Sequence, residues 1–426
     1  MIPYVLTVLP GLLLLLSGLW ARRRYQSWLY PGGFFSLYWG GILIAVAGFP
    51  VEPHFWPGAA WVLCAFGVLL ILGGLASDKL FVLREQRPPQ CRSFLLGGRM
   101  IILSSSILGL LAAVLLARNI GYPASSVLSP QGIIRLGERY ASLRYSQGKG
   151  LPFFVNVLNA FFYAGMIYSG VWVKVSANRW HRFIVILPLG VGLLLAFVVN
   201  ARTNLIWGII FMISAYMAGS VFRGEHREFF TVKRIIAGMT IFVLLIAFYI
   251  ALQTFRDPRY ADIQLSILKA RVSILSPPIA FSIWLKENWK LLDPSWGAKT
   301  FGGVFDILGL AERKQGVGWE GTVFQVNGRI FRPNVYTAFR QLIEDFTLPG
   351  AMLIMFVFGI IVSTAYKRLE QGHFAWIPVL SLFYALVMGS YLANFMYYNS
   401  LLLSWVIFSV IIIAPCYLLI YRGRHA

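Results

Sequence analysis

The chain has 426 residues, of which 58% are hydrophobic and only 12% are charged, and its formal net charge is +21. Soluble domains carry about 25% charged residues, so this composition excludes a soluble protein and predicts a single integral membrane domain over residues 1–426. The positive charge falls mainly in loops that flank apolar segments, as membrane insertion requires. We therefore expect the lipid bilayer, and no nucleic acid, as a partner.

Apolar segments long enough to cross a bilayer, which takes about 20 residues, recur along the whole chain. They predict an all-α polytopic membrane protein with about eleven transmembrane helices. The predicted spans are 2–20, 33–50, 58–76, 100–117, 153–173, 183–199, 204–222, 235–255, 350–366, 374–393 and 399–421.

Basic residues mark one side of this predicted domain. Two or more Lys or Arg occur in every second connection and in the tail, namely in 21–32, 77–98, 174–182, 223–234, 367–373 and 422–426. The short connections 51–57 and 394–398 hold none, and the turn before the seventh span holds only Arg202. By the positive-inside rule, the N-terminus lies outside and the C-terminus inside. The long segments 118–152 and 256–349 are then external loops.

Both external loops contain apolar patterns. In the first, apolar residues recur at near-helical spacing over 131–146, which predicts an amphipathic helix on the membrane surface. The second holds two apolar segments, 263–275 and 279–285, which Pro277-Pro278 should split into two interfacial or re-entrant helices. The glycine-rich segment 296–328 predicts a loop with little regular structure.

Cysteine, histidine and acidic residues limit the possible chemistry. The three cysteines and five histidines show no pairing or ligand-type spacing, which predicts no disulfide, no metal site and no cofactor. None of the sixteen acidic residues falls inside a predicted span. Ion-coupled carriers usually place carboxylates at mid-membrane, so this distribution favours an enzyme at the membrane face over such a transporter.

The densest polar segment, 329–350, closes the second external loop and leads into a span. Asn334, directly after a proline, predicts a helix start, and Pro349 predicts the helix end. Residues spaced i, i+3, i+7 and i+11 share one face of such a helix. This polar face would consist of Asn334, Thr337, Gln341 and Asp345.

Arginines surround the start of this predicted helix. Arg329 and Arg332 precede it, and Arg340 stands four positions after Tyr336 and four before Glu344. Helix N-termini with free N–H groups and nearby arginines bind anions, so we expect an anionic lipid-linked substrate here. The alternative is a surface-lying helix whose polar face meets water and whose Arg340 pairs with Glu344.

Two further basic groups lie outside the predicted membrane core. Arg135, Arg139 and Arg144 are in the first external loop, and Arg202 is at the outer end between two spans. A charge at that end is costly unless it is hydrated or paired. These arginines either converge on the charged group of a substrate or contact lipid headgroups and snorkel to the surface.

Three short motifs lie in the polar segment: Asn334-Val335-Tyr336-Thr337, Glu344-Asp345-Phe346, and Pro349-Gly350 before a span. They resemble motifs of the bacterial oligosaccharide repeat unit polymerases, the O-antigen polymerases of the Wzy type, with Thr347 where that family usually has Gly. The segment around Arg202 is similar to a second element of the family. The related ligases usually have a His-Asn pair late in the large loop, and the absence of His from 256–349 favours a polymerase.

The resemblance implies a GT-C-like fold and a metal-independent membrane glycosyltransferase of polysaccharide and lipopolysaccharide biosynthesis. Such an enzyme transfers the growing glycan from undecaprenyl pyrophosphate to the next lipid-linked repeat unit. It lies in the bacterial inner membrane, with many spans and with its active site facing the periplasm. Its implied partners are the undecaprenyl-pyrophosphate-linked oligosaccharide, a chain-length regulator and a flippase.

We therefore expect Asp345 to be the general base, with Glu344 and Arg202 as further catalytic residues. Two other functions also fit the sequence: a flippase-like transporter of lipid or polysaccharide, and another lipid-carrier-dependent membrane glycosyltransferase, ligase or acyltransferase. The expected substrate-binding residues are Arg135, Arg139, Arg144, Arg329, Arg332, Asn334, Tyr336, Thr337, Arg340 and Gln341.

Overall fold

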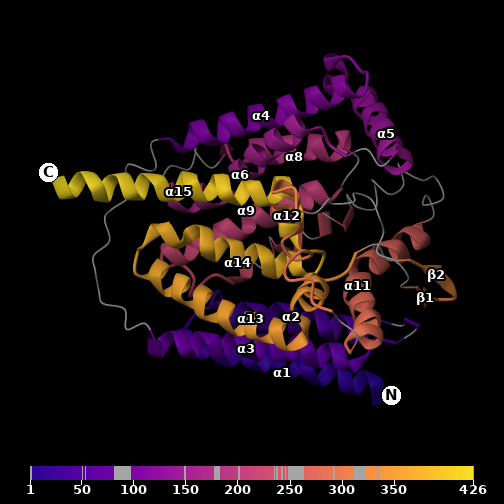
Figure 1. The fold of residues 1–426 in the computed structure, drawn as a ribbon, viewed down its shortest axis with the longest axis vertical. Coiled ribbons are helices and arrows are strands. Elements are labelled where there is room, and N and C mark those ends of the chain that lie inside the picture. The colour runs from indigo at the N-terminus through magenta and orange to yellow at the C-terminus, as the bar shows by residue number, and fades with distance from the viewer. Residues whose placement is uncertain are drawn as a thin grey trace.

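The computed structural model describes the chain except residues 1, 50, 53, 81–96, 148–149, 177–182, 200–201, 235, 237, 241–242, 245, 248–262, 291–292, 311–322, 333–334 and 426. The described part is a bundle of helices with one two-stranded hairpin (Figure 1). Six of its helices are long and apolar enough to cross a membrane, so the chain is an all-α membrane protein. They are α1 (Ile2–Tyr25), α3 (Pro57–Leu80), α4 (Gly98–Asn119), α6 (Phe153–Val175), α9 (Arg202–Phe222) and α13 (Ala338–Glu370).

Four shorter apolar helices pack into the same bundle. They are α2 (Pro31–Ala47), α8 (Ile186–Val198), α14 (Ile377–Ser390) together with the preceding η4 (Phe374–Trp376), and the part Asn399–Pro415 of α15 (Asn399–His425). Together with the six long helices they match ten of the predicted spans. The remaining predicted span, 235–255, lies largely outside the described residues.

Glycines let the helix pairs approach closely, as is common in membrane proteins, where small residues bring backbones together. A methyl group added at Gly73 of α3 would lie 2.2 Å from the carbonyl oxygen of Phe356 on α13. One added at Gly359 of α13 would lie 2.5 Å from the carbonyl oxygen of Leu70. The contact between α3 and α13 is therefore a backbone contact, and it fixes α13 against α3, which itself packs on α1 and α2.

The two ends of the bundle differ in composition. The end where α1 begins holds η2 (Ala124–Leu128), α5 (Pro130–Gln147), α11 (Ile263–Asn288) and the hairpin (Figure 1). The other end holds the basic last turn of α1 and the C-terminus of α15. Asp78 at this second end accepts a hydrogen bond from Tyr25 (2.7 Å) and pairs with Lys367 and with Arg24 (3.7 Å).

The predicted amphipathic helix over 131–146 is confirmed as α5. Leu136 and Tyr140 are buried, whereas Arg135 and Arg139 are exposed. The burial follows the helical spacing of the apolar residues.

The predicted split at Pro277-Pro278 is wrong, because α11 continues through both prolines. Proline inside a helix removes a hydrogen bond and costs about 3 kcal/mol. The second half of α11 is nevertheless held by its surroundings: Ile279, Ala280 and Phe281 are fully buried, and Ser282 accepts a hydrogen bond from the backbone N–H of Trp56 (2.6 Å). Tertiary burial thus overrides the tendency of proline to end a helix, and the sequence pattern alone does not reveal this burial.

The predicted loop over 296–328 contains two short elements among its described residues. These are α12 (Gly302–Ile307) and β1 (Phe324–Val326), which pairs with β2 (Arg329–Phe331). Their positions define the surroundings of the polar segment that follows.

Candidate functional site

The polar segment begins in a β-hairpin. Strands β1 and β2 are antiparallel, and the turn between them is Asn327-Gly328, with φ values of 50° and 72°. Asn-Gly with positive φ at both positions is the preferred two-residue hairpin turn. The backbone of Gln325 exchanges two hydrogen bonds with that of Glu52 (2.7 and 3.0 Å). The hairpin is therefore fixed to the connection that follows α2.

The helix of this segment begins later than the sequence predicted. Its first residue is Ala338, and Thr337 is the N-cap with extended backbone angles. Asn334, the expected start, lies outside the described residues. The ring of Phe339, in the first turn, packs against Trp39 (5.2 Å between ring centroids) and Phe66 (5.3 Å). This contact fixes the first turn, and the chain approaches it without forming another turn over 335–337.

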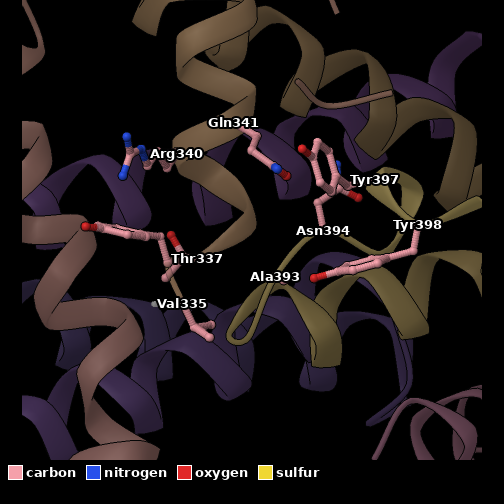
Figure 2. Close-up of a pocket in the computed structure, with 9 residues that line it drawn as sticks. Val335, Thr337, Arg340, Gln341, Ala393, Asn394, Tyr397 and Tyr398 are labelled. Atoms are coloured by element: carbon pink, nitrogen blue, oxygen red, sulfur yellow. The ribbon is translucent and has the colours of Figure 1, made fainter. Parts of the chain in front are cut away.

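A pocket lies between this first turn and the connection from α14 to α15. Its empty volume is about 430 Å³, part of it open to solvent. Figure 2 shows the residues around it, which come from two separate stretches of the chain. The lining residues are Val335, Tyr336, Thr337, Arg340, Gln341, Ala393, Asn394, Tyr397 and Tyr398.

Two buried oxygen atoms in the pocket lining have no hydrogen-bond partner among the described residues. They are the hydroxyl oxygen of Thr337, a residue that is 1% exposed, and the carboxamide oxygen of Gln341, which is 7% exposed. Buried polar atoms are rarely left without a partner. By contrast, the Asn394 side chain donates to the Thr300 carbonyl (2.7 Å) and accepts from the Met396 N–H (3.0 Å).

Arg340 is held by both an ion pair and aromatic rings. Its Nε donates to Glu344 Oε1 at 2.9 Å, and the other Glu344 oxygen lies 3.2 Å from the Nζ of Lys299. The Arg340 guanidinium lies 4.3 Å from the ring centroid of Tyr336 and 5.1 Å from that of Trp284. The alternative sequence interpretation, an Arg340–Glu344 pair, is confirmed as a contact. This pair lies in a buried setting, since Glu344 is 4% exposed.

Asp345 is fully buried and faces the segment 295–300, which precedes α12. Its carboxylate accepts three hydrogen bonds, from the Ser295 hydroxyl, the Lys299 N–H (3.0 Å) and the Thr300 N–H. It does not line the pocket. This geometry suits a carboxylate that positions the segment 295–300, and it does not favour the general-base role that the sequence suggested. Glu344 is likewise occupied on both oxygens by cations.

The backbone of α13 contributes to the same arrangement. Pro349 has no N–H to offer the Asp345 carbonyl one turn earlier, and Trp296 donates its N–H to that carbonyl instead (3.1 Å). Ser295 N–H donates to the Glu344 carbonyl (3.3 Å). Thr347 breaks the helix with φ 60° and ψ 174°, angles normally reserved for glycine. A glycine at position 347, usual in the family that the sequence resembles, would therefore suit this turn.

A chain of contacts connects Asp345 to the pocket. The carboxylate holds the Thr300 N–H, and the Thr300 carbonyl accepts from Asn394, which lines the pocket. The Asn394 carboxamide in turn caps η5 (Phe395–Tyr397), the turn that carries Tyr397. Removal of the Asp345 carboxylate would loosen one wall of the pocket from a distance.

The other predicted site residues are more scattered. Helix α5, with Arg135 and Arg139 exposed and Arg144 half-buried, packs on η2 and α8, and Figure 1 shows it away from α13. Arg329 on β2 and Arg332 after it are exposed and do not line the pocket. The described contacts thus do not bring the expected arginines together at one point.

Arg202 is the first residue of α9, and its side chain lies outside the described part. Trp207, about one and a half turns further along α9, contacts Phe395 of η5 (5.6 Å between ring centroids). The start of α9 is thus close to the turn that carries one wall of the pocket.

Several lining residues were missed by the sequence interpretation. Asn394, Tyr397 and Tyr398 lie in the connection 394–398, which the sequence marked only by its lack of basic residues. Two tyrosines and an asparagine within five residues, between two apolar spans, are the signal that could have found them. Comparison of the chain with protein-family models, with curated proteins and with solved structures finds no match.

Proposed function

We propose that this protein is a polymerase of lipid-linked oligosaccharide repeat units. It would transfer the growing glycan from undecaprenyl pyrophosphate to the next lipid-linked repeat unit, without a metal ion. The observation that carries the proposal is the polar pocket at the start of α13, which is lined in part by Val335, Tyr336 and Thr337 of the motifs that resemble this family. Its lining combines tyrosine rings, carboxamides and a hydroxyl, groups that suit a polyhydroxylated substrate.

The two ends of the bundle support an orientation in the membrane. Basic residues concentrate at the last turn of α1 and near the C-terminus, so we assign this end to the cytoplasm. The pocket, α5, α11 and the hairpin are then on the periplasmic side of a bacterial inner membrane. A lipid-linked substrate would enter from the outer leaflet, with its isoprenoid chain along the bundle. With the predicted span 235–255, the chain would have eleven spans and a GT-C-like architecture.

The proposed reaction forms one bond and breaks one. The acceptor hydroxyl oxygen attacks the anomeric carbon of the growing glycan, and the bond from this carbon to the pyrophosphate oxygen breaks. Undecaprenyl pyrophosphate leaves with the electron pair, and the hydroxyl proton is released to solvent. Positive charge next to the leaving group would stabilise the transition state, and Arg202, at the start of α9 near η5, is the residue we assign to this role.

The test is glycan synthesis by purified protein in lipid nanodiscs. The substrate is a lipid-pyrophosphate oligosaccharide, and chelator is added throughout. We expect a ladder of products from the wild type and from the control Arg227→Ala, which removes an exposed arginine at the other end of the bundle. We expect no ladder from Arg202→Ala.

Two results would contradict the proposal, the first by overturning the function and the second by overturning only the assignment of Arg202. One is movement of the lipid-linked oligosaccharide across the bilayer with no change in its length, which would indicate a flippase-like transporter. The other is full-length product from correctly inserted Arg202→Ala protein, which would remove Arg202 from the mechanism.

A further inference from the structure

We infer that the pocket at the start of α13 binds an uncharged sugar ring of the acceptor, and that the pyrophosphate of the lipid carrier binds elsewhere. The inference rests on the proposed function and names which part of the substrate this site takes. Four observations support it: the charge balance of the site, two buried polar atoms, the tyrosine lining and the fixed backbone around it.

The charged groups next to the pocket cancel. Arg340 and Lys299 are the cations, and both contact Glu344, while Asp345 holds the adjacent segment. Figure 2 shows the Arg340 side chain directed away from Asn394 and Tyr397. A pyrophosphate group binds best to cations that no carboxylate neutralises, ideally to arginines that each donate two parallel N–H groups to its oxygens. In this pocket the Nε of the Arg340 guanidinium instead donates to the Glu344 carboxylate, which neutralises the charge of the guanidinium and so suits an uncharged ligand.

The unpartnered polar atoms belong to groups that hydroxyls satisfy. The Gln341 carboxamide points toward Asn394 and Tyr397 across the pocket (Figure 2). Its carboxamide oxygen accepts only, and the Thr337 hydroxyl both donates and accepts. Neither has a hydrogen-bond partner within the part of the chain that the structure describes. Sugar hydroxyls donate and accept at once, so one ring can satisfy both side chains, whereas a fully ionised phosphate cannot donate to the Gln341 oxygen.

The tyrosines supply flat apolar surface next to these polar groups. Tyr336, Tyr397 and Tyr398 line the pocket from both of its sides. A pyranose ring has an apolar face of C–H groups that packs on an aromatic ring, with its hydroxyls at the edge. A combination of aromatic surface and a few placed polar groups is typical of small-molecule sites.

The backbone around the pocket is fixed before any ligand binds. A methyl group added at Gly302 of α12 would lie 2.5 Å from the Tyr397 ring, and one added at Gly303 would lie 2.6 Å from the Met396 carbonyl oxygen. Asn399, at the start of α15, donates a hydrogen bond to Asp306 of α12. Helix α12 therefore supports the wall that carries Tyr397. A site fixed in this way loses little conformational freedom on binding.

The test uses saturation-transfer NMR on the full chain in nanodiscs. The probes are methyl glycosides of glucose, galactose, mannose and N-acetylglucosamine, and, separately, inorganic pyrophosphate as a competitor. We expect at least one glycoside to bind, pyrophosphate not to displace it, and Gln341→Ala to weaken its binding at least tenfold. The matched control is Gln131→Ala, an exposed glutamine on α5, which should leave binding unchanged.

A second variant separates binding from folding. Thr337→Val keeps the shape of the side chain and removes the hydroxyl, which makes no capping hydrogen bond. Because a buried hydroxyl without a partner is costly, this variant should raise the thermal unfolding midpoint and at the same time weaken glycoside binding. If Thr337 had only a structural role, Thr337→Val would lower the unfolding midpoint and glycoside binding together.

The outcomes are distinct from those of the polymerase test. Binding of no glycoside, displacement by pyrophosphate, or unchanged binding in both Gln341→Ala and Thr337→Val would overturn the inference. Glycoside binding that depends on Gln341, in a protein that makes no glycan ladder, would support the sugar site and refute the polymerase.

Discussion

Replacement of Asp345 distinguishes a positioning carboxylate from a general base. Asp345→Ala removes the acceptor of three donors: the buried Thr300 N–H, the part-buried Lys299 N–H and the part-buried Ser295 hydroxyl, which keeps only a long contact to the Glu344 carbonyl (3.4 Å). A hydrogen bond to a charged group contributes about 1.5–3 kcal/mol, and each orphaned buried donor costs about 1–3 kcal/mol. Since the three donors share one segment, the losses are not additive, and we expect a total of about 3–4 kcal/mol.

Asp345→Asn refines the same prediction. The asparagine retains one acceptor oxygen, which can still serve two of the donors, but its NH₂ group faces the third. We expect it to lose about half as much stability as Asp345→Ala, roughly 1.5–2 kcal/mol. The matched control is Asp293→Ala, which removes an exposed carboxylate shortly before Ser295 and should change stability by less than about 0.5 kcal/mol.

Two measurements on each variant check the reasoning. The first is the thermal unfolding midpoint in detergent, and the second is trypsin cleavage after Lys299, read by mass spectrometry. Cleavage should increase in Asp345→Ala because the segment 295–300 opens locally. If Asp345→Ala abolished glycan synthesis without lowering the midpoint or exposing Lys299, the positioning role would be refuted and the general-base role supported.

Three further predictions concern the frame of the site. Thr347→Gly should raise the unfolding midpoint by relieving a backbone conformation that costs a non-glycine residue about 1–3 kcal/mol; a lower midpoint would show that the kink is not strained. Gly359→Ala should destabilise the folded protein by about 1–3 kcal/mol, because its methyl would lie 2.5 Å from a backbone oxygen of α3. The control Gly41→Ala, which has open space around it, should not destabilise the protein. Equal unfolding midpoints for the two variants would contradict this backbone contact. The hydrogen bond from Lys174 holds the pKa of Glu225 below its ordinary value, so this pair stabilises the fold above that ordinary pKa and is lost as pH falls through the lowered one. Glu225→Gln should therefore lower the midpoint at neutral pH, and the difference from wild type should vanish on acidification; a difference that persisted in acid would exclude the ion pair as its cause.

The membrane character of the chain was predictable from the sequence, for a physical reason. A span requires a run of apolar residues that is visible locally, so ten predicted spans coincide with apolar helices of the bundle. The amphipathic helix α5 followed in the same way, because its apolar spacing is regular over several turns. Signals of this kind depend only on neighbours in the sequence.

Sites whose parts come from distant segments could not be predicted in this way. The sequence picked out Thr337, Gln341 and Arg340 as polar residues near a helix start, but not the wall that contains Asn394 and Tyr397. That wall meets α13 only because α14 and α15 pack into the same bundle.

The surroundings of the Asp345 carboxylate were likewise set by tertiary contacts. A general base and a structural carboxylate share the same residue type and helical spacing, so the sequence made Asp345 a plausible base. Only the folded chain brings the segment 295–300 against Asp345, where three donors occupy its carboxylate. The sequence by itself determined that the chain is a helical membrane protein with a polar segment before a span. Packing determined that α13 begins at Ala338, that α11 passes through two prolines, and which polar atoms face the pocket. Each of these three features depends on burial against residues far away in the chain.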